Sequence, residues 1–219
     1  MFTDFYRAFY YSFLIIAAVI GLLYFKKVDK TFRWVCLLII LTLISELIAK
    51  YFSLHRKPNG IVYIIFTPVE YFVYVMIYTS FFDDKKWSKI LFTSVACLVF
   101  AGIINTIFFQ PAIETPTNTM NIESVLLVVL SLKLFINIRE KPVYENVLSE
   151  GVFWFNSAVL IYYSFDILFW GFHNIAFRLR NPPAIIYNGL LLFSGLLYIV
   201  YAVSVLVNFS TVGKIAKTG

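Results

Sequence analysis

Long apolar runs, separated by short polar segments, organise the whole chain. We predict seven such runs as helices, at 9–25, 32–50, 61–82, 90–109, 120–138, 152–172 and 184–208. At a rise of 1.5 Å per residue, each helix is long enough to cross roughly 30 Å of hydrocarbon. The polar segments between them are too short to fold as extramembrane domains. The pattern therefore predicts an all-α polytopic membrane protein, a single domain of seven transmembrane helices over residues 1–219.

The composition agrees with this class and argues against a nucleic-acid partner. Hydrophobic residues make up 61% of the chain and charged residues 14%, whereas a soluble domain is about half apolar and about a quarter charged. The net charge of +6 comes from Lys and Arg clusters between the apolar runs, which is typical of topology signals and not of a phosphate-binding face. We expect the protein in the cell membrane, and in the inner membrane if the chain is bacterial.

The distribution of basic residues predicts the orientation in the membrane. If the N-terminus is outside, the inner segments hold twelve of the 18 Lys and Arg residues and the outer segments hold six. Because cytoplasmic segments carry the excess of Lys and Arg, this favours an N-terminus outside and a cytoplasmic C-terminus. Trp34, Trp87 and Trp154 then fall at the inner interface and Trp170 at the outer one, as in an aromatic belt.

The third apolar run, "IVYIIFTPVEYFVYVMIY" at 61–78, carries Glu70 near its middle. A charged side chain at that depth costs a few kcal/mol, so it usually faces the bundle interior or a water-filled cavity. Tyr63, Thr67, Glu70 and Tyr74 recur at spacings of 4, 3 and 4, which places them on one helical face. Pro68 on the same helix predicts a kink.

Helix 152–172 repeats this arrangement, because Asn156, Tyr163, Asp166 and Trp170 follow at spacings of 7, 3 and 4. With the N-terminus outside, most polar side chains of the other helices lie in the outer half, and Glu70 lies at the floor. We therefore predict an outward-facing acidic and aromatic pocket. Its candidate ligand-binding residues are Glu70, Asp166, Tyr63, Thr67, Tyr74, Tyr163, Trp170, Asn105, Asn188, Glu46 and Glu123.

Some of these residues also fit a purely structural role. Glu46 precedes Lys50 by four residues, so the two could form an ion pair on one helix face. Glu123 lies near the start of its helix, where an acid suits the helix dipole, and Asn105 and Asn188 suit hydrogen bonds between helices. For Glu70 and Asp166 depth makes a structural role costly, and function is favoured.

Several chemistries lack the residues that they need. A retinal protein needs a lysine in the middle of its seventh helix, and 184–208 has none. The seven-helix zinc hydrolases use three histidines, and this chain has two, His55 and His173. There is no Gly-rich phosphate loop and no cysteine cluster. We predict no cofactor and no metal, and an acid–base enzyme built on Glu70 and Asp166 is the least favoured class.

The number and orientation of the helices resemble those of heptahelical receptors and of small sugar transporters. The Pro-Gln dipeptide of the sugar-transporter relatives is not present, since "TPVE" and "NPPA" stand in its place. Two functions stay open. The first is binding or sensing of a small polar or cationic ligand, with signalling through a separate partner or a second copy of the chain. The second is secondary transport coupled to protons or cations through the intramembrane carboxylates. The outward polarity favours binding, and Pro68 beside a midplane Glu70 favours transport.

Overall fold

The computed structural model describes residues 2–82, 84–140, 147–178 and 184–218. Its helices are α1 (Phe2–Tyr24), α2 (Lys30–Leu54), α3 (Gly60–Thr79), α4 (Lys85–Phe108), α5 (Thr117–Glu140), the short 3-10 helix η1 (Val147–Ser149), α6 (Gly151–Arg178) and α7 (Ala184–Thr218). Within the described residues, seven helices are long and apolar enough to cross a membrane. This confirms the prediction of a multi-pass helical protein.

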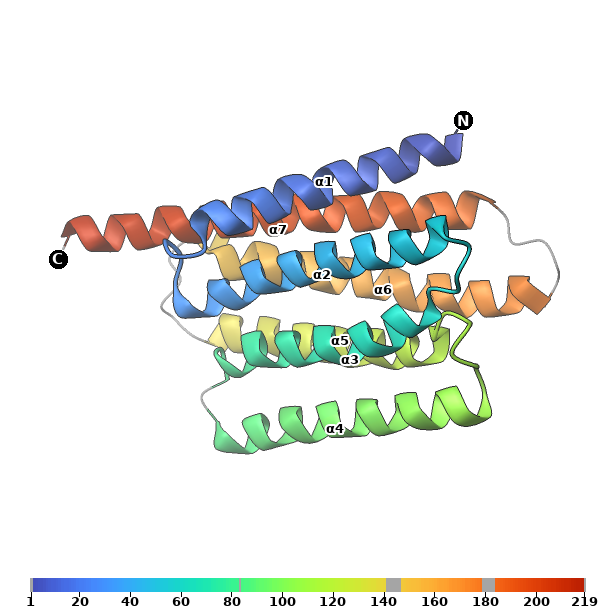
Figure 1. The fold of residues 1–219 in the computed structure, drawn as a ribbon. Helices are drawn as coiled ribbons and strands as arrows, with labels where there is room; N and C mark the ends of the chain where they lie inside the picture. The colour runs from blue at the N-terminus through green and yellow to red at the C-terminus, as the bar shows by residue number, and fades with distance from the viewer. Residues whose placement is uncertain (1, 83, 141–146, 179–183, 219) are drawn as a thin grey trace.

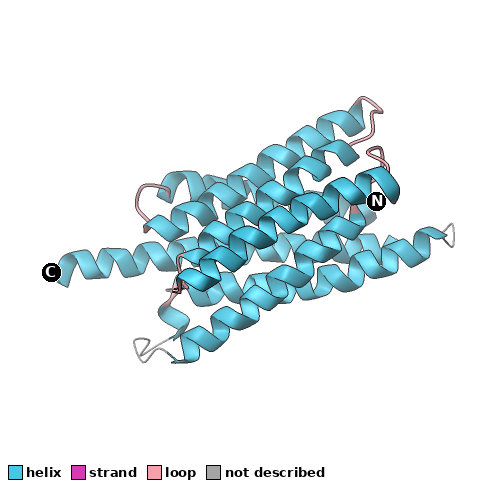
Figure 2. Ribbon diagram, turned by 90° about the horizontal axis from the view of Figure 1, so that it is seen from below, coloured by secondary structure: helices cyan, strands magenta, loops and turns pink. Residues whose placement is uncertain are grey.

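Six of the seven long helices form a closed ring. Going round it, α1 packs against α2, α2 against α3, α3 against α5, α5 against α6, α6 against α7, and α7 returns to α1. Helix α4 lies outside the ring, against α3 and α5, at the edge of the bundle in Figure 1. The helices run side by side along one direction, with the two chain ends at opposite ends of the bundle (Figures 1 and 2). The interior of the ring is therefore lined without α4.

Aspartate caps set the starts of α2 and α4. Asp29 accepts a hydrogen bond from the Phe32 backbone N–H at 2.9 Å, and Asp84 accepts one from the Lys86 N–H at 2.8 Å. These are N-caps, so α2 and α4 begin earlier than the predicted residues 32 and 90. Helix α7 continues beyond its predicted end at 208 to Thr218. Of the basic residues counted for orientation, Lys141 and Arg180 lie outside the described residues.

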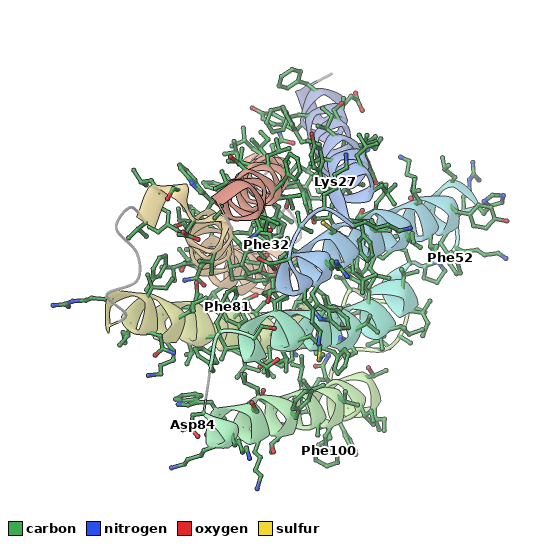
Figure 3. All side chains as sticks on the ribbon, turned by 90° about the vertical axis from the view of Figure 1, so that its left-hand side faces the viewer. Lys27, Phe32, Phe52, Phe81, Asp84 and Phe100 are labelled. Atoms are coloured by element: carbon green, nitrogen blue, oxygen red, sulfur yellow. The ribbon has the colours of Figure 1, made fainter. Side chains whose placement is uncertain are left out.

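The outer surface of the bundle is apolar and the aromatic core faces inward. Phe32 is 2% exposed and points into the bundle, whereas Phe100 on α4 is 65% exposed and points away from it (Figure 3). Ile107 and Leu22 are exposed to a similar degree. An apolar surface this extensive is unfavourable in water but matches the hydrocarbon of a bilayer.

In the half of the bundle that carries the C-terminus, buried polar groups pair with one another. Asn156 accepts hydrogen bonds from Tyr78 at 2.9 Å and Ser131 at 2.8 Å, and it donates to the Ser131 carbonyl at 3.0 Å. Nearer the end, Asn208 of α7 donates to the Asp29 carboxylate at 2.6 Å. The Asn156 bonds join α3, α5 and α6, and the Asn208 bond joins α7 to the start of α2, so in this half the buried polar groups are satisfied internally.

Candidate ligand cavity

The opposite half of the ring encloses a cavity of about 270 Å³. It begins at Asn59 and Thr115, in the connections that precede α3 and α5, at the end of the bundle where the N-terminus lies. Along α3 its lining continues to Glu70, which is about 16 Å further at 1.5 Å per residue. One turn deeper, Tyr74 is fully buried and no longer lines it. Glu70 therefore lies at the floor, as the sequence predicts.

Four of the 12 acidic residues of the chain line this cavity, one from each of four helices. They are Glu46 of α2, Glu70 of α3, Glu123 of α5 and Asp166 of α6. Among the described residues that line it, none is Lys, Arg or His. The cavity is thus acidic, and no basic side chain in this lining balances its carboxyl groups.

The two most buried acids differ in how they are held. Asp166 is 5% exposed and accepts a short hydrogen bond of 2.7 Å from the Ser124 hydroxyl on α5. Glu123 is 3% exposed, and its Oε1 has no hydrogen-bond partner in the described part of the chain. A buried acceptor without a donor is unfavourable, because it has lost water without a replacement. Glu123 can therefore accept a donor that a ligand brings into the cavity.

Glu70 is held less firmly than Asp166. Its Oε1 accepts one long hydrogen bond, 3.4 Å, from the Tyr163 hydroxyl, which is beyond the usual O–H···O range of about 2.5 to 3.0 Å. Glu70, Glu123 and Asp166 are close enough for their charges to interact. A cation placed among them would interact favourably with all three.

Eight of the 21 residues that line the cavity are aromatic. The set consists of tyrosines with one phenylalanine and one tryptophan: Tyr10, Tyr63, Tyr162, Tyr163, Tyr187, Tyr198, Phe66 and Trp170. The Tyr63 hydroxyl donates to Glu46 at 3.4 Å. Aromatic faces attract cations, more strongly where water is excluded, so the walls and the acids favour the same kind of ligand.

A chain of tyrosine hydroxyls closes the floor below Glu70. The Tyr163 and Tyr74 hydroxyls are hydrogen-bonded to each other at 3.1 Å, and Tyr74 and Tyr201 share a hydrogen bond of 2.6 Å. Together with the contact from Tyr163 to Glu70, these bonds run from the cavity into the closed half of the bundle. They link α3, α6 and α7 at the depth where the cavity ends.

Eight of the eleven predicted site residues line the cavity: Glu46, Tyr63, Thr67, Glu70, Glu123, Tyr163, Asp166 and Trp170. Tyr74 lies beneath it, in the tyrosine chain. Asn105 is on α4 outside the ring, where it donates to Gln110 at 3.0 Å and accepts from Asn118 at 2.9 Å. Asn188 is half-buried on α7 and is not part of the lining. The sequence pattern shows which helix carries a residue, but it does not show where that helix packs. It therefore cannot distinguish Asn105, on a helix outside the ring, from the residues that line the cavity.

The contacts of Glu46 and Glu123 differ from the ion pair with Lys50 and the helix-dipole role that the sequence also allows for them. Glu46 is half-buried and bonded to Tyr63, while Lys50, its predicted ion-pair partner, is exposed. Glu123 lies in the second turn of α5 and is buried within the bundle. Both residues line the cavity.

Sequence reasoning missed part of the lining on α7 and α1. Tyr187, Ser194 and Tyr198 of α7 lie in the lining at spacings of 7 and 4, and Tyr10 of α1 lines it as well. The same face of α7 continues three residues further to Tyr201. This helical spacing of polar and aromatic residues is the signal that could have identified α7, because it repeats the pattern used for α3 and α6.

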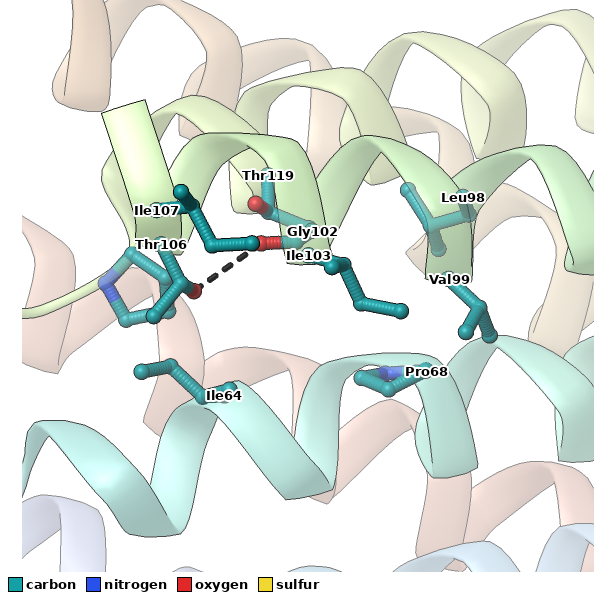
Figure 4. Close-up of a pocket in the computed structure, with 10 residues that line it drawn as sticks. Ile64, Pro68, Leu98, Val99, Gly102, Ile103, Thr106, Ile107 and Thr119 are labelled. Carbon is teal, nitrogen blue, oxygen red and sulfur yellow. Dashed lines mark hydrogen bonds between the residues drawn. The ribbon is translucent and has the colours of Figure 1, made fainter. Parts of the chain in front are cut away.

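A second hollow, of about 250 Å³, lies between α3, α4 and the start of α5 (Figure 4). Its lining is mainly aliphatic, with Ile64, Pro68 and Ile103 among the residues. The Thr106 hydroxyl in its wall is already bonded to the Gly102 carbonyl at 2.9 Å. This hollow offers packing space and little polar chemistry.

Within the described ranges there is no group of three or more His, Cys, Asp or Glu side chains placed to hold a metal ion.

Comparisons of this chain with models of known protein families, with curated proteins and with solved structures found no match. The fold and the cavity define a seven-helix, multi-pass class of membrane protein. What such a protein can bind follows from the cavity itself.

Proposed function

We propose that this protein binds a small cationic ligand in the acidic cavity and reports its presence to a separate partner. The observation that carries the proposal is the buried Glu123, whose Oε1 is unpaired among the described residues, in a cavity whose described lining holds three further acids and no basic side chain. An ammonium group supplies both the donors and the positive charge that this set of acceptors needs. The aromatic walls add attraction for a cation.

The orientation proposed with this function is an outside N-terminus and a cytoplasmic C-terminus. Basic residues are twice as frequent in the segments at the C-terminal end of the bundle, as the positive-inside rule requires for a cytoplasmic face. The cavity begins at the other end, so in this orientation its mouth lies at the outer face of the membrane. The closed half, with its paired polar groups, then faces the cytoplasm.

Reporter fusions test the orientation. We expect green fluorescent protein fused after Gly219 to fluoresce, and alkaline phosphatase fused at the same point to be inactive, because the C-terminus is cytoplasmic. Fusions in the connection between α2 and α3 serve as the reciprocal control and should show the opposite pair of results. An active phosphatase after Gly219 would contradict the orientation.

Ligand charge provides the direct test of binding. Protein in lipid nanodiscs should bind hexylamine at least tenfold more tightly than 1-hexanol or hexanoate, because the three share an alkyl chain and differ in head-group charge. A charge-assisted hydrogen bond contributes roughly 1.5 to 3 kcal/mol, which corresponds to a tenfold or larger difference in affinity. Isothermal titration calorimetry, with empty nanodiscs subtracted, measures the three affinities. Equal affinities would overturn the proposal.

Secondary transport is the second candidate, and two observations favour it. Pro68 lies inside α3 two residues before Glu70 and removes one backbone hydrogen-bond donor there, and helices that are weakened or broken near the midplane are common at transporter sites. The tyrosine chain below Glu70 also reaches into the closed half, as a path for protons would. Proteoliposomes distinguish the two functions, because a transporter accumulates radiolabelled hexylamine above the level of protein-free liposomes when a proton gradient is imposed, and a receptor does not.

A further inference from the structure

A crevice of about 290 Å³ lies between α6 and α7 and shares part of its lining with the acidic cavity. The shared residues are Asp166, Tyr162 and Leu190. The rest of the crevice is apolar, with Phe165, Phe169 and Phe193 among its residues. An acid of the cavity therefore lies at the meeting point of a polar space and an apolar one.

The crevice faces the lipid side of the bundle. Leu168 and Phe172 in its wall are 57% and 58% exposed, on the apolar surface that the bilayer covers. The Phe165 and Phe193 rings stack at 3.9 Å between centroids and bridge α6 to α7. The crevice therefore opens on the apolar outer surface of the bundle.

We propose that the ligand is an amphiphilic amine that enters from the bilayer. Its ammonium group lies among Asp166, Glu70 and Glu123, and its alkyl chain lies in the phenylalanine-lined crevice between α6 and α7. This inference rests on the proposed cation-binding function and adds the ligand class and the route of entry.

The arrangement of charge and apolar surface selects this class. Acids at the inner end of the crevice attract a cationic head group and repel the anionic head groups of acidic phospholipids. The aromatic and aliphatic walls of the crevice are a favourable environment for a hydrocarbon chain. A hydrophilic crevice would be unfavourable, because the chain would leave lipid to contact a polar surface. A small hydrophilic amine would use the cavity and leave the crevice to lipid.

Gly189 offers a way to fill the crevice without touching the acids. It lies on α7 in the crevice lining, and a Cβ placed on it would meet no atom within 4 Å. A larger side chain there occupies the space proposed for the alkyl chain. Gly171 on α6 also has nothing within 4 Å of its would-be Cβ but lies outside the crevice lining, so the same substitution there is a matched control.

The test compares propylamine, hexylamine and dodecylamine by calorimetry in nanodiscs, with empty nanodiscs subtracted. For wild type and for Gly171→Phe, the affinity for amine dissolved in water should rise at least tenfold from propylamine to dodecylamine, since each methylene removed from water contributes about fourfold. For Gly189→Phe, propylamine should bind as to wild type and dodecylamine at least tenfold more weakly than to wild type. Gly189→Leu should follow Gly189→Phe, and serves if the larger variant does not fold.

The outcomes separate the two proposals. If amines bind better than alcohols but chain length or the Gly189 substitutions have no effect, the crevice has no role in binding, and the inference is wrong while the proposed function stands. If no amine of any length binds better than its alcohol, the proposed function and the inference are both overturned. A loss of dodecylamine binding in Gly171→Phe equal to that in Gly189→Phe would also overturn the inference.

Discussion

Glu70→Gln and Asp166→Asn should each weaken hexylamine binding by about tenfold to a hundredfold, the largest effects expected on binding. Each amide keeps the size of the acid but loses its charge, and a charge-assisted hydrogen bond contributes roughly 1.5 to 3 kcal/mol. Both side chains line the cavity, on α3 and α6. Calorimetric titration of the two single variants and the double variant in nanodiscs gives the three affinity losses.

The double variant should lose less than the product of the two single losses. Glu70 and Asp166 interact electrostatically across the same space, so one ammonium group would contact both. Groups that share a partner are not additive. When one acid is replaced, the cation can move toward the other acid and toward Glu123. The affinity lost on replacing the second acid is then smaller than in the wild-type background.

The control for a general charge effect is Glu114→Gln. Glu114 is an exposed acid in the connection between α4 and α5, at the same end of the bundle as the cavity but outside its lining. This variant removes one negative charge and should leave hexylamine affinity within about twofold of wild type, as expected for a screened surface charge. Fully multiplicative losses in the double variant would mean two separate sites, and a loss at Glu114 would mean that the surface charge, and not the cavity, attracts the amine.

The fold class followed from the sequence because hydrophobic length is a local property. An apolar run long enough to cross a bilayer can be read residue by residue, and all seven runs became helices. The faces of α3 and α6 were predictable for the same reason, since spacings of three and four residues fix which side chains share a face. These faces predict that Glu70 and Asp166 share a cavity, and both line it.

The position of each helix in the ring could not be predicted in this way. Asn105 has the depth and polarity of a site residue, but α4 packs outside the ring, and that depends on contacts between segments far apart in the chain. The crevice between α6 and α7 was also hidden, because phenylalanines that line a crevice and phenylalanines that face lipid have the same sequence pattern. The role of Gly189 in lining the crevice is likewise not visible in the sequence, because it depends on the open space beside the residue in the folded bundle.

Asn156→Leu should destabilise the bundle more than any of the cavity or crevice substitutions. Asn156 is 0% exposed and is bonded to Tyr78 of α3 and Ser131 of α5, so it joins three helices. Leucine has a similar volume but leaves the Tyr78 hydroxyl buried without its acceptor. An unsatisfied buried group costs about 1 to 3 kcal/mol, so we expect a loss of about 2 kcal/mol in the free energy of unfolding, measured by SDS titration from bicelles.

Adding Tyr78→Phe to Asn156→Leu should recover part of this loss, because it removes the hydroxyl that the first substitution leaves unpaired. Replacing both partners of a buried hydrogen bond by apolar groups is often close to neutral, whereas removing one is not. Ser164→Ala is the control. Its hydroxyl is exposed and bonded to the Leu160 carbonyl of its own helix, so its removal should change the unfolding free energy by less than about 0.5 kcal/mol. If Asn156→Leu changed it no more than Ser164→Ala does, the closed half of the bundle would be held by apolar packing and not by this hydrogen-bond network.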